Sequence, residues 1–181
     1  LIIGSGAVGL SMGYLLHDKV VKYYLGRGST YKFLSEKILI TTSDLYSEPK
    51  IISNIRKFGN CISIEDINCL IIAIREHDLE KIGDDILDLC NNVNCVIIVC
   101  NTLSSFNSVK CKINNSNTYL AIINSGIKYV SPKVLRIIDN NLRIYIRAKK
   151  DDLPDAFRKG SIREMNSNNE NTILLERYLK N

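Results

Sequence analysis

The feature that most restricts the fold is a glycine motif placed directly after a short apolar run. Leu1-Ile2-Ile3 has the composition of a buried strand, and the next residues have the spacing Gly-x-Gly-x-x-Gly, with glycines at positions 4, 6 and 9. A helical pattern follows over residues 7–16. A glycine-rich turn between a strand and a helix is typical of the first unit of an open α/β sheet.

Each glycine of the motif has a different expected task. Gly4 permits a tight turn, Gly6 lets a ligand approach the backbone because it has no Cβ, and Gly9 allows close helix–strand packing. A helix that begins after such a loop offers unpaired N–H groups to a phosphate. We therefore predict that Gly4-Ser5-Gly6-Ala7-Val8-Gly9 binds the pyrophosphate of a dinucleotide. The alternative is a glycine-rich turn without a ligand.

The rest of the chain continues the alternation of strands and helices. A helix is expected over residues 78–90, where apolar side chains mark one face, and residues 37–64 look like an excursion of short strands and turns. The expected strands are runs rich in Ile, Leu, Val and Tyr at residues 20–25, 68–74, 95–100, 119–124, 129–130, 134–138 and 142–146. The last four predict an antiparallel extension of the sheet.

The final segment has a different composition. Residues 149–171 are polar, which predicts a linker, and residues 172–180 predict a short helix. We therefore expect an α/β fold: a Rossmann-like domain over residues 1–148, with a parallel sheet and helices on both faces, followed by this reduced second part over residues 149–181. Apolar side chains on the last helix favour a homodimer formed through it: Leu174, Leu175, Tyr178 and Leu179.

Composition narrows the classes of function. At 181 residues the chain can hold one full domain and a small appendage. The net charge of +5 is spread along the chain and Trp is absent, so an anionic small ligand fits better than a nucleic acid. The six cysteines form no Cys-x-x-Cys pair, and neither His17 nor His77 has metal-ligand spacing. We therefore expect reduced core cysteines and no metal site.

Hydropathy also bears on the cellular location. No apolar run reaches the roughly 18 residues that a membrane-spanning helix needs, and no signal-peptide pattern is present. We therefore expect a cytoplasmic protein without a membrane partner. Because strands usually run about five residues, we also expect some residues to precede Leu1.

The end of the second expected strand bears on the choice of cofactor. NAD enzymes usually place a carboxylate there for the ribose 2′-OH, whereas NADP enzymes supply a cation. The sequence reads Tyr24-Leu25-Gly26-Arg27-Gly28-Ser29-Thr30 and has no carboxylate. The planar guanidinium of Arg27 can bind a phosphate, and Ser29 or Thr30 can add a hydroxyl. This predicts NADPH with Arg27 at the 2′-phosphate; the alternative is an arginine in a solvated loop.

Two more polar residues follow expected parallel strands, where open α/β sheets bind their ligands. Arg75 follows the strand at 68–74, and Asn101 follows the strand at 95–100. Asn101 can donate and accept a hydrogen bond, which suits a carboxamide, hydroxyl or carbonyl near a nicotinamide. The alternatives are a turn-forming Asn101 and an Arg75 that caps a helix or pairs with Glu76 or Asp78.

Together these features resemble the ketopantoate reductase (2-dehydropantoate 2-reductase) family over about residues 1–148. Besides the glycine motif and Arg27, the similar parts are Asp66 to Arg75, Val96 to Asn101, and Asn124-Ser125-Gly126 to Ser131-Pro132-Lys133-Val134-Leu135. The resemblance implies that NADPH is bound by the glycine motif, Arg27 and Arg75. It also implies that Asn101 contacts both the nicotinamide ribose and the substrate.

The chain departs from the family pattern at three places. Arg75 stands where the family usually has Lys, and Thr102 stands where it commonly has Gly. Family members also continue with a long helical domain that supplies a catalytic Lys as general acid. Lys180 lies in a segment similar to the helix that bears this lysine. It is the one candidate for the general acid in this chain, and the identity of the acid stays open.

Three hypotheses follow for the function. The first is NADPH-dependent reduction of a small 2-keto acid, above all ketopantoate to pantoate in pantothenate and coenzyme A biosynthesis. The second is an NADP-binding regulatory or degenerate module without catalysis. The third is the cofactor domain of a different dehydrogenase.

Overall fold

The structure of the chain, a computed structural model, places the backbone of most residues. Three residues with a predicted role in binding, Arg27, Ser29 and Thr30, lie outside the described residues, as does Lys180, so what was predicted for them stays a prediction. The described residues are 1–26, 31–32, 34, 36–42, 48–58, 63–131, 133–138, 142–166 and 169–179.

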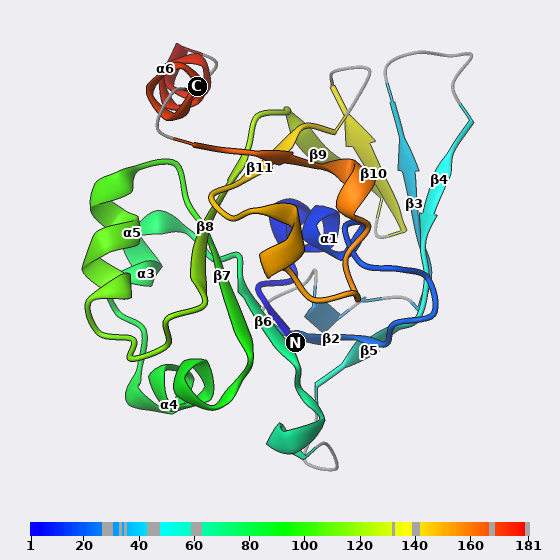
Figure 1. The fold of residues 1–181 in the computed structure, drawn as a ribbon. Coiled ribbons are helices and arrows are strands. Elements are labelled where there is room, and N and C mark those ends of the chain that lie inside the picture. The colour runs from blue at the N-terminus through cyan, green and yellow to red at the C-terminus, as the bar shows by residue number, and fades with distance from the viewer. Residues whose placement is uncertain are drawn as a thin grey trace.

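Eight strands form the main sheet. Their bounds are β1 Ile2–Ile3, β2 Lys22–Leu25, β5 Ile55–Lys57, β6 Cys69–Ile72, β7 Cys95–Val99, β8 Thr118–Ile123, β11 Ile144–Ile146 and β12 Ile162–Glu164. Their order is β12-β11-β8-β7-β6-β1-β2-β5 (Figure 1). Every pair between β5 and β8 is parallel, whereas β11 pairs antiparallel with β8 and parallel with β12.

Helices cover both faces of this sheet, and the fold class predicted from the sequence is confirmed. The helix α1 Ala7–Gly13 packs on one face, and α3 Glu76–Leu79, α4 Asp84–Asn92 and α5 Leu103–Lys110 pack on the other (Figure 1). A last helix, α6 Glu170–Leu179, joins the second face through Ile173. Short 3-10 turns lie at η1 Ile64–Asp66, η2 Lys150–Asp152 and η3 Lys159–Ser161.

A second, mixed sheet of four strands shares the face of α1. It consists of β3 Ile38–Thr41, β4 Lys50–Ile52, β9 Ile127–Ser131 and β10 Val134–Ile137, in the order β4-β3-β10-β9. The prediction that residues 129–130 and 134–138 extend the main sheet is therefore wrong. β10 pairs instead with β3 from the predicted excursion, and β9 pairs with β10. The side chains of both strands alternate, and only one face packs on the core around α1.

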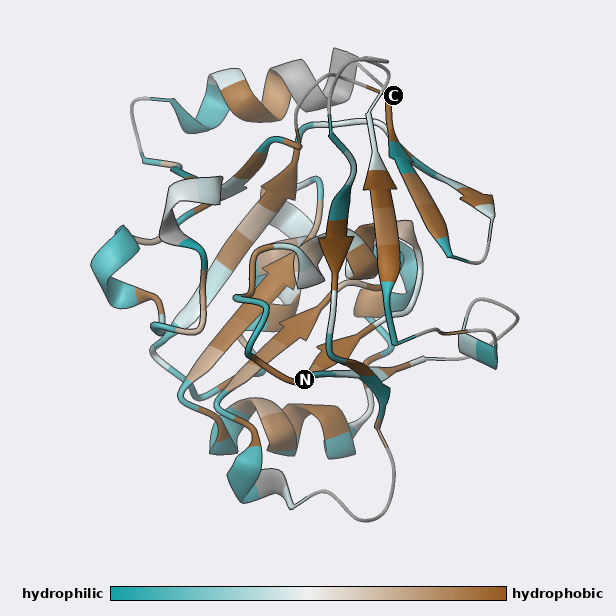
Figure 2. Cartoon of the chain, turned by 90° about the vertical axis from the view of Figure 1, so that its right-hand side faces the viewer, coloured by the Kyte–Doolittle hydropathy of each residue, from teal (hydrophilic) through white to brown (hydrophobic). Residues whose placement is uncertain are grey.

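The main sheet is buried on both faces, which explains its continuous apolar runs. All five residues of β7 are buried, and Figure 2 shows the central strands as hydrophobic along their length. Its side chains alternate between two clusters, with Ile97 facing α1 and Ile98 facing α4 and α5. The polar residues Arg75 and Asn101 follow the carboxyl ends of two of these buried strands, β6 and β7.

The helix predicted over residues 78–90 is in fact two helices. The chain turns between Leu79 and Asp84, where Gly83 has an extended backbone with φ −73° and ψ 161°. The pair Asp84 and Asp85 stands in the first turn of α4, where carboxylates favour a helix start. Gly83 was the sequence signal for this break.

The segment predicted as a linker, 149–171, packs onto the sheet where the structure describes it. It supplies the edge strand β12, and Phe157 is only 1% exposed. Residues 156–158 also lie against the end of α1: His17 N donates to Ala156 O at 2.9 Å, and Arg158 Nε donates to Leu16 O at 3.1 Å. Because most residues of this segment are polar, its few buried residues gave no recognisable strand pattern in the sequence. The division into two parts at residue 148 stays a prediction.

The cysteine prediction is partly correct. All five described cysteines are free, and burial raises the pKa of Cys90 to about 11 and that of Cys100 to about 12. These thiols therefore stay protonated near neutral pH. Cys111, however, is exposed rather than part of the core, because it follows directly after the last turn of α5.

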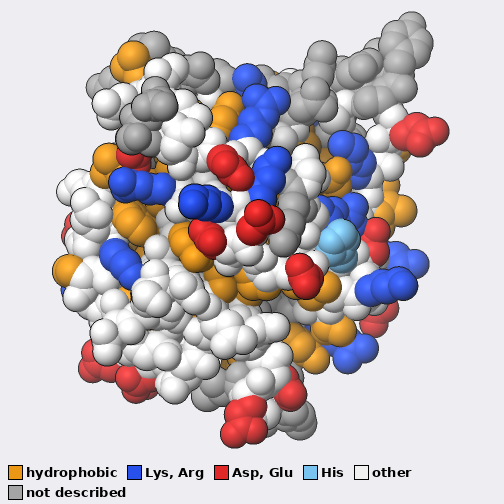
Figure 3. Space-filling model, in the orientation of Figure 1, with side chains coloured by type: hydrophobic (Ala, Val, Ile, Leu, Met, Phe, Trp, Pro, Cys, Tyr) orange, Lys and Arg blue, Asp and Glu red, His pale blue; other side chains and the backbone are white. Residues whose placement is uncertain are grey.

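The described surface mixes charges of both signs. Figure 3 shows Lys and Arg side chains beside Asp and Glu on the face seen there. Within the described ranges, no helix has both the length and the apolar character required to cross a membrane. On α6, Ile173 is buried and Leu175 is 58% exposed. The homodimer expected through this helix stays a prediction.

Candidate cofactor-binding site

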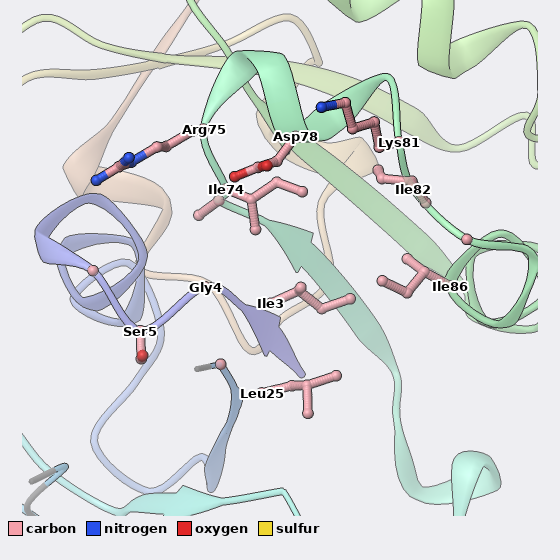
Figure 4. A pocket seen from close by; sticks show the side chains of 14 residues that line it. Ile3, Gly4, Ser5, Leu25, Ile74, Arg75, Asp78, Lys81, Ile82 and Ile86 are labelled. Atoms are coloured by element: carbon pink, nitrogen blue, oxygen red, sulfur yellow. The ribbon is translucent and has the colours of Figure 1, made fainter. Parts of the chain in front are cut away.

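A cleft of about 960 Å³ opens at the carboxyl ends of β1, β2 and β6 (Figure 4). In the sheet, β2 and β5 lie on one side of β1, and β6, β7 and β8 lie on its other side. The strand order therefore reverses between β1 and β6. Ligands of open α/β sheets bind at this point. The cleft is lined by Ile3, Gly4, Ser5, Gly6, Leu25, Gly26, Ala73, Ile74, Arg75, Asp78, Lys81, Ile82, Gly83 and Ile86.

The three motif glycines differ in what surrounds them. Gly4 has φ +109°, and a Cβ there would lie 2.2 Å from Ala73 O. A Cβ on Gly9 would lie 1.9 Å from Gly4 O. Gly6 is exposed, and a Cβ there would meet nothing within 4 Å. Gly4 and Gly9 are therefore required by packing within the protein, whereas Gly6 borders open space in the cleft.

The other residues of the motif support the turn. Ser5 is 3% exposed, and a Cβ on Gly26 would lie 2.5 Å from its Oγ. Ala7 packs against the core, whereas Val8 is 38% exposed. The end of β2 therefore presses on the loop through Gly26, the residue that immediately precedes Arg27 in the sequence.

The cleft combines an apolar floor with charged groups at its rim. In Figure 4, Ile3 and Ile86 point toward each other across the cleft. The charged side chains are Arg75, Asp78 and Lys81, two cations against one carboxylate. Asp78 also lies 3.6 Å from the imidazole of His77. Such a site suits a ligand with an apolar ring and an anionic part.

Arg75 is exposed and stands at the N-cap position of α3. Its carbonyl accepts the amides of Asp78 and Leu79, but its side chain makes no capping hydrogen bond. In Figure 4 the guanidinium extends from the end of β6 toward α1 and the glycine motif. Its position is therefore compatible with the predicted contact to a cofactor.

Asn101 follows β7, the neighbour of β6, and is half-buried. It is not among the described residues that line the cleft. The next residue, Thr102, is the N-cap of α5 and accepts from Ser105 N at 3.2 Å. Its hydroxyl also donates to Glu76 Oε1 at 2.6 Å, which ties the loop after β7 to α3. Arg75 and Asn101 thus come from adjacent, connected strand ends.

Sequence reasoning missed part of this cleft. It did not assign a role in binding to Lys81, Ile82 or Ile86, because residues 78–90 were expected to form one helix with Ile82 and Ile86 on its apolar face. It also missed Tyr129, whose hydroxyl donates to Ser5 O at 2.9 Å. Among the described residues, no group of three His, Cys, Asp or Glu could hold a metal ion.

Comparisons with known proteins agree with this geometry. Three solved structures with high similarity are a PanE/ApbA family ketopantoate reductase from Ralstonia eutropha JMP134 (TM-score 0.67, 12% identity), a 2-dehydropantoate 2-reductase from Geobacter metallireducens GS-15 (0.65, 12%) and D-mandelate dehydrogenase in complex with NADH (0.64, 15%). They cover 96%, 91% and 96% of this chain. At these identities the matches show the fold alone.

The chain spans 59%, 58% and 56% of the length of these three structures. No curated protein gives a significant sequence match. A protein-family model described as "Ketopantoate reductase PanE/ApbA" matches residues 1–150, most of the chain. The chain therefore belongs to the ketopantoate reductase family, whose members are NAD(P)H-dependent oxidoreductases.

Proposed function

We propose that this chain binds NADPH and serves the reduction of a small 2-keto acid, with ketopantoate as the first substrate to test. The observation that carries the proposal is the contrast within the glycine motif. Gly4 and Gly9 are enclosed by the protein's own backbone, whereas Gly6 borders the open cleft. A phosphate can reach the backbone there, as family membership implies.

The cleft residues divide into groups that suit the parts of NADPH. The glycine motif would hold the pyrophosphate, with Arg75 adding positive charge. The apolar floor would hold the adenine. Arg27, next in sequence to the cleft residue Gly26, would hold the 2′-phosphate. The D-mandelate dehydrogenase structure contains NADH, so the preference for NADPH rests on Arg27 and on the absence of a carboxylate at this place in the sequence.

When bound, NADPH supplies the hydride for reduction of the C2 carbonyl. This chain's part in the reaction is to hold the cofactor and to orient the substrate. Asn101, at the end of β7, would hydrogen-bond the nicotinamide ribose and the substrate. Reduction also requires a proton for the new hydroxyl. Lys180 is the candidate donor within this chain.

The cofactor assignment is tested by fluorescence titration with NADPH and NADH. We expect tighter binding of NADPH by wild-type protein. Arg27→Ala should weaken NADPH binding more than tenfold and leave NADH nearly unchanged, since only NADPH carries the 2′-phosphate. Arg27→Lys keeps the charge and serves as the matched control, with an intermediate loss. Equal affinities for both cofactors, unchanged by Arg27→Ala, would refute the assignment.

The reaction is tested by NADPH oxidation with ketopantoate and a panel of other 2-keto acids. Turnover with ketopantoate supports the proposal, and turnover only with other substrates supports a different dehydrogenase of the family. Tight NADPH binding without any turnover would instead support a binding module. Because the Staphylococcus aureus ketopantoate reductase is described as dimeric, the assay should be paired with a mass measurement in solution.

A further inference from the structure

A tyrosine from the second sheet holds the glycine motif. The hydroxyl of Tyr129, on β9, donates to Ser5 O at 2.9 Å across 124 positions of sequence. The strand β9 does not belong to the main sheet, yet it packs directly against α1. The second sheet therefore contacts the loop that borders the cleft.

The direction of this hydrogen bond follows from the two groups that form it. A backbone carbonyl can only accept, so the phenol must be the donor. Burial raises the pKa of Tyr129 to about 12, and the hydroxyl therefore keeps its proton throughout the neutral range. The ring packs partly buried against the core cluster around α1, which limits its movement.

The hydrogen bond sets the orientation of one peptide. The described chain has no cis peptide bond, and in a trans peptide the C=O and N–H groups point in opposite directions. Holding Ser5 O on the Tyr129 side therefore directs the amide of Gly6 to the other side. Ser5 and Gly6 both line the cleft, and no acceptor among the described residues takes the Gly6 amide.

A second tyrosine beneath α1 offers a contrast. Tyr24, on β2, is fully buried, and its hydroxyl lies 3.5 Å from Gly9 O. A Cβ on Gly13 would lie 2.1 Å from this hydroxyl, so Tyr24 fills the space under the helix. Tyr24 does not line the cleft. Its hydroxyl donates to Gly9 O, and no hydrogen bond among the described residues joins it to the Ser5–Gly6 peptide.

We propose that Tyr129 is a positioning residue of the cofactor site, which orients the Ser5–Gly6 peptide so that the Gly6 amide faces the pyrophosphate. This inference rests on the proposed function, because it requires a pyrophosphate at the glycine motif. It assigns the second sheet a task in cofactor binding. It also predicts that the loss of one phenol oxygen affects only ligands that contain a pyrophosphate.

The test compares Tyr129→Phe with Tyr24→Phe, each of which removes one hydroxyl that donates to a backbone carbonyl of the glycine motif. Calorimetry measures the affinity of the full chain for NADPH, for 2′-phospho-ADP-ribose, which retains the pyrophosphate, and for adenosine 2′-monophosphate, which lacks it. We expect Tyr129→Phe to weaken the first two about tenfold and to leave the third within twofold. Tyr24→Phe should leave the ratio between the three affinities unchanged.

The outcomes separate this inference from the proposed function. Wild-type protein that fails to bind NADPH contradicts the proposed function. Wild-type protein that binds NADPH, with Tyr129→Phe binding it equally well, contradicts the role of Tyr129 alone. An equal loss for all three ligands would show a general structural role and would also overturn the inference.

A second measurement requires no variant. In wild-type protein labelled with ¹⁵N-glycine, 2′-phospho-ADP-ribose should shift the Gly6 amide resonance much more than adenosine 2′-monophosphate does. A Gly6 resonance that responds equally to both ligands would refute the predicted direction of its N–H group.

Discussion

Alanine substitutions at Gly6 and Gly4 should separate ligand binding from folding. At Gly6 the backbone has φ −74° and ψ 179°, which alanine adopts readily, and the added Cβ meets nothing within 4 Å. Alanine at a helix N-cap costs roughly 0.5–1 kcal/mol more than glycine. The smaller entropy of the unfolded chain offsets this by about 0.4–1 kcal/mol. The free energy of unfolding should therefore change by less than about 1 kcal/mol.

Gly4→Ala should behave in the opposite way. The φ of +109° is strained for alanine, which costs about 1–3 kcal/mol, and a Cβ 2.2 Å from Ala73 O forces the backbone to move at a similar cost. We expect a loss of at least about 2 kcal/mol of unfolding free energy. For a chain of this size that lowers Tm by about 4–8 °C or more.

Cofactor affinity completes the comparison. At Gly6 the new methyl group occupies space that the pyrophosphate would use, and overpacking of about 1–3 kcal/mol corresponds to a roughly five- to 150-fold weaker NADPH affinity. Thermal unfolding and NADPH titration of both variants measure the two effects. If Gly6→Ala binds NADPH like wild type, the cleft is not the pyrophosphate site; if it unfolds as early as Gly4→Ala, Gly6 is a packing residue.

Three further predictions concern other parts of the molecule. Burial of Lys22 lowers its pKa from 10.5 to about 8, so the unfolded chain binds more protons than the folded chain between these pH values. The unfolding free energy should therefore rise by up to about 3 kcal/mol as the pH increases through this range. Urea unfolding at pH 7.5, 9 and 10.5 measures this rise, which Lys22→Met should abolish. Phe157→Ala should cost about 3–5 kcal/mol in the same assay, whereas Leu175→Ala, at a side chain 58% exposed, should cost almost nothing; equal effects would contradict the packing of residues 149–166. Arg75→Ala should weaken NADPH binding about three- to fivefold at low salt and less at high salt, because salt screens the charge. Arg75→Lys should bind NADPH nearly as well as wild type. A loss of affinity that does not depend on salt would exclude an electrostatic role of Arg75.

The main sheet and the glycine motif were predictable because each has a strong local signal. Residues 95–100 form a continuous apolar run, which fits only a strand buried on both faces, and Gly-x-Gly-x-x-Gly marks the turn before α1. The strand end at Arg75 followed from the same periodicity. Each of these signals is contained within a few consecutive residues, so no tertiary information was required.

The errors concern elements that tertiary contacts define. The edge strand β5 has only Ile55 buried, so its three residues carry no strand pattern of their own. The strand β12 likewise buries only Ile162 within a polar segment. The contact of Tyr129 with Ser5 joins the second sheet to the loop after β1, and nothing local in the sequence indicates it. Of these long-range contacts, the one between Tyr129 and Ser5 reaches a residue that lines the cleft.

The contacts at the end of α1 also define how short a stable version of this protein can be. The family match ends at residue 150, but the carbonyls of Leu15 and Leu16 are satisfied by Arg158, and Ala156 accepts from His17. A chain cut at the limit of the family match would leave the Leu15 and Leu16 carbonyls, which follow α1, without their partner and would expose the edge of β11 to association with other chains. An expression boundary or a domain graft should therefore fall after β12, because the unit that folds extends beyond the residues that the family model matches.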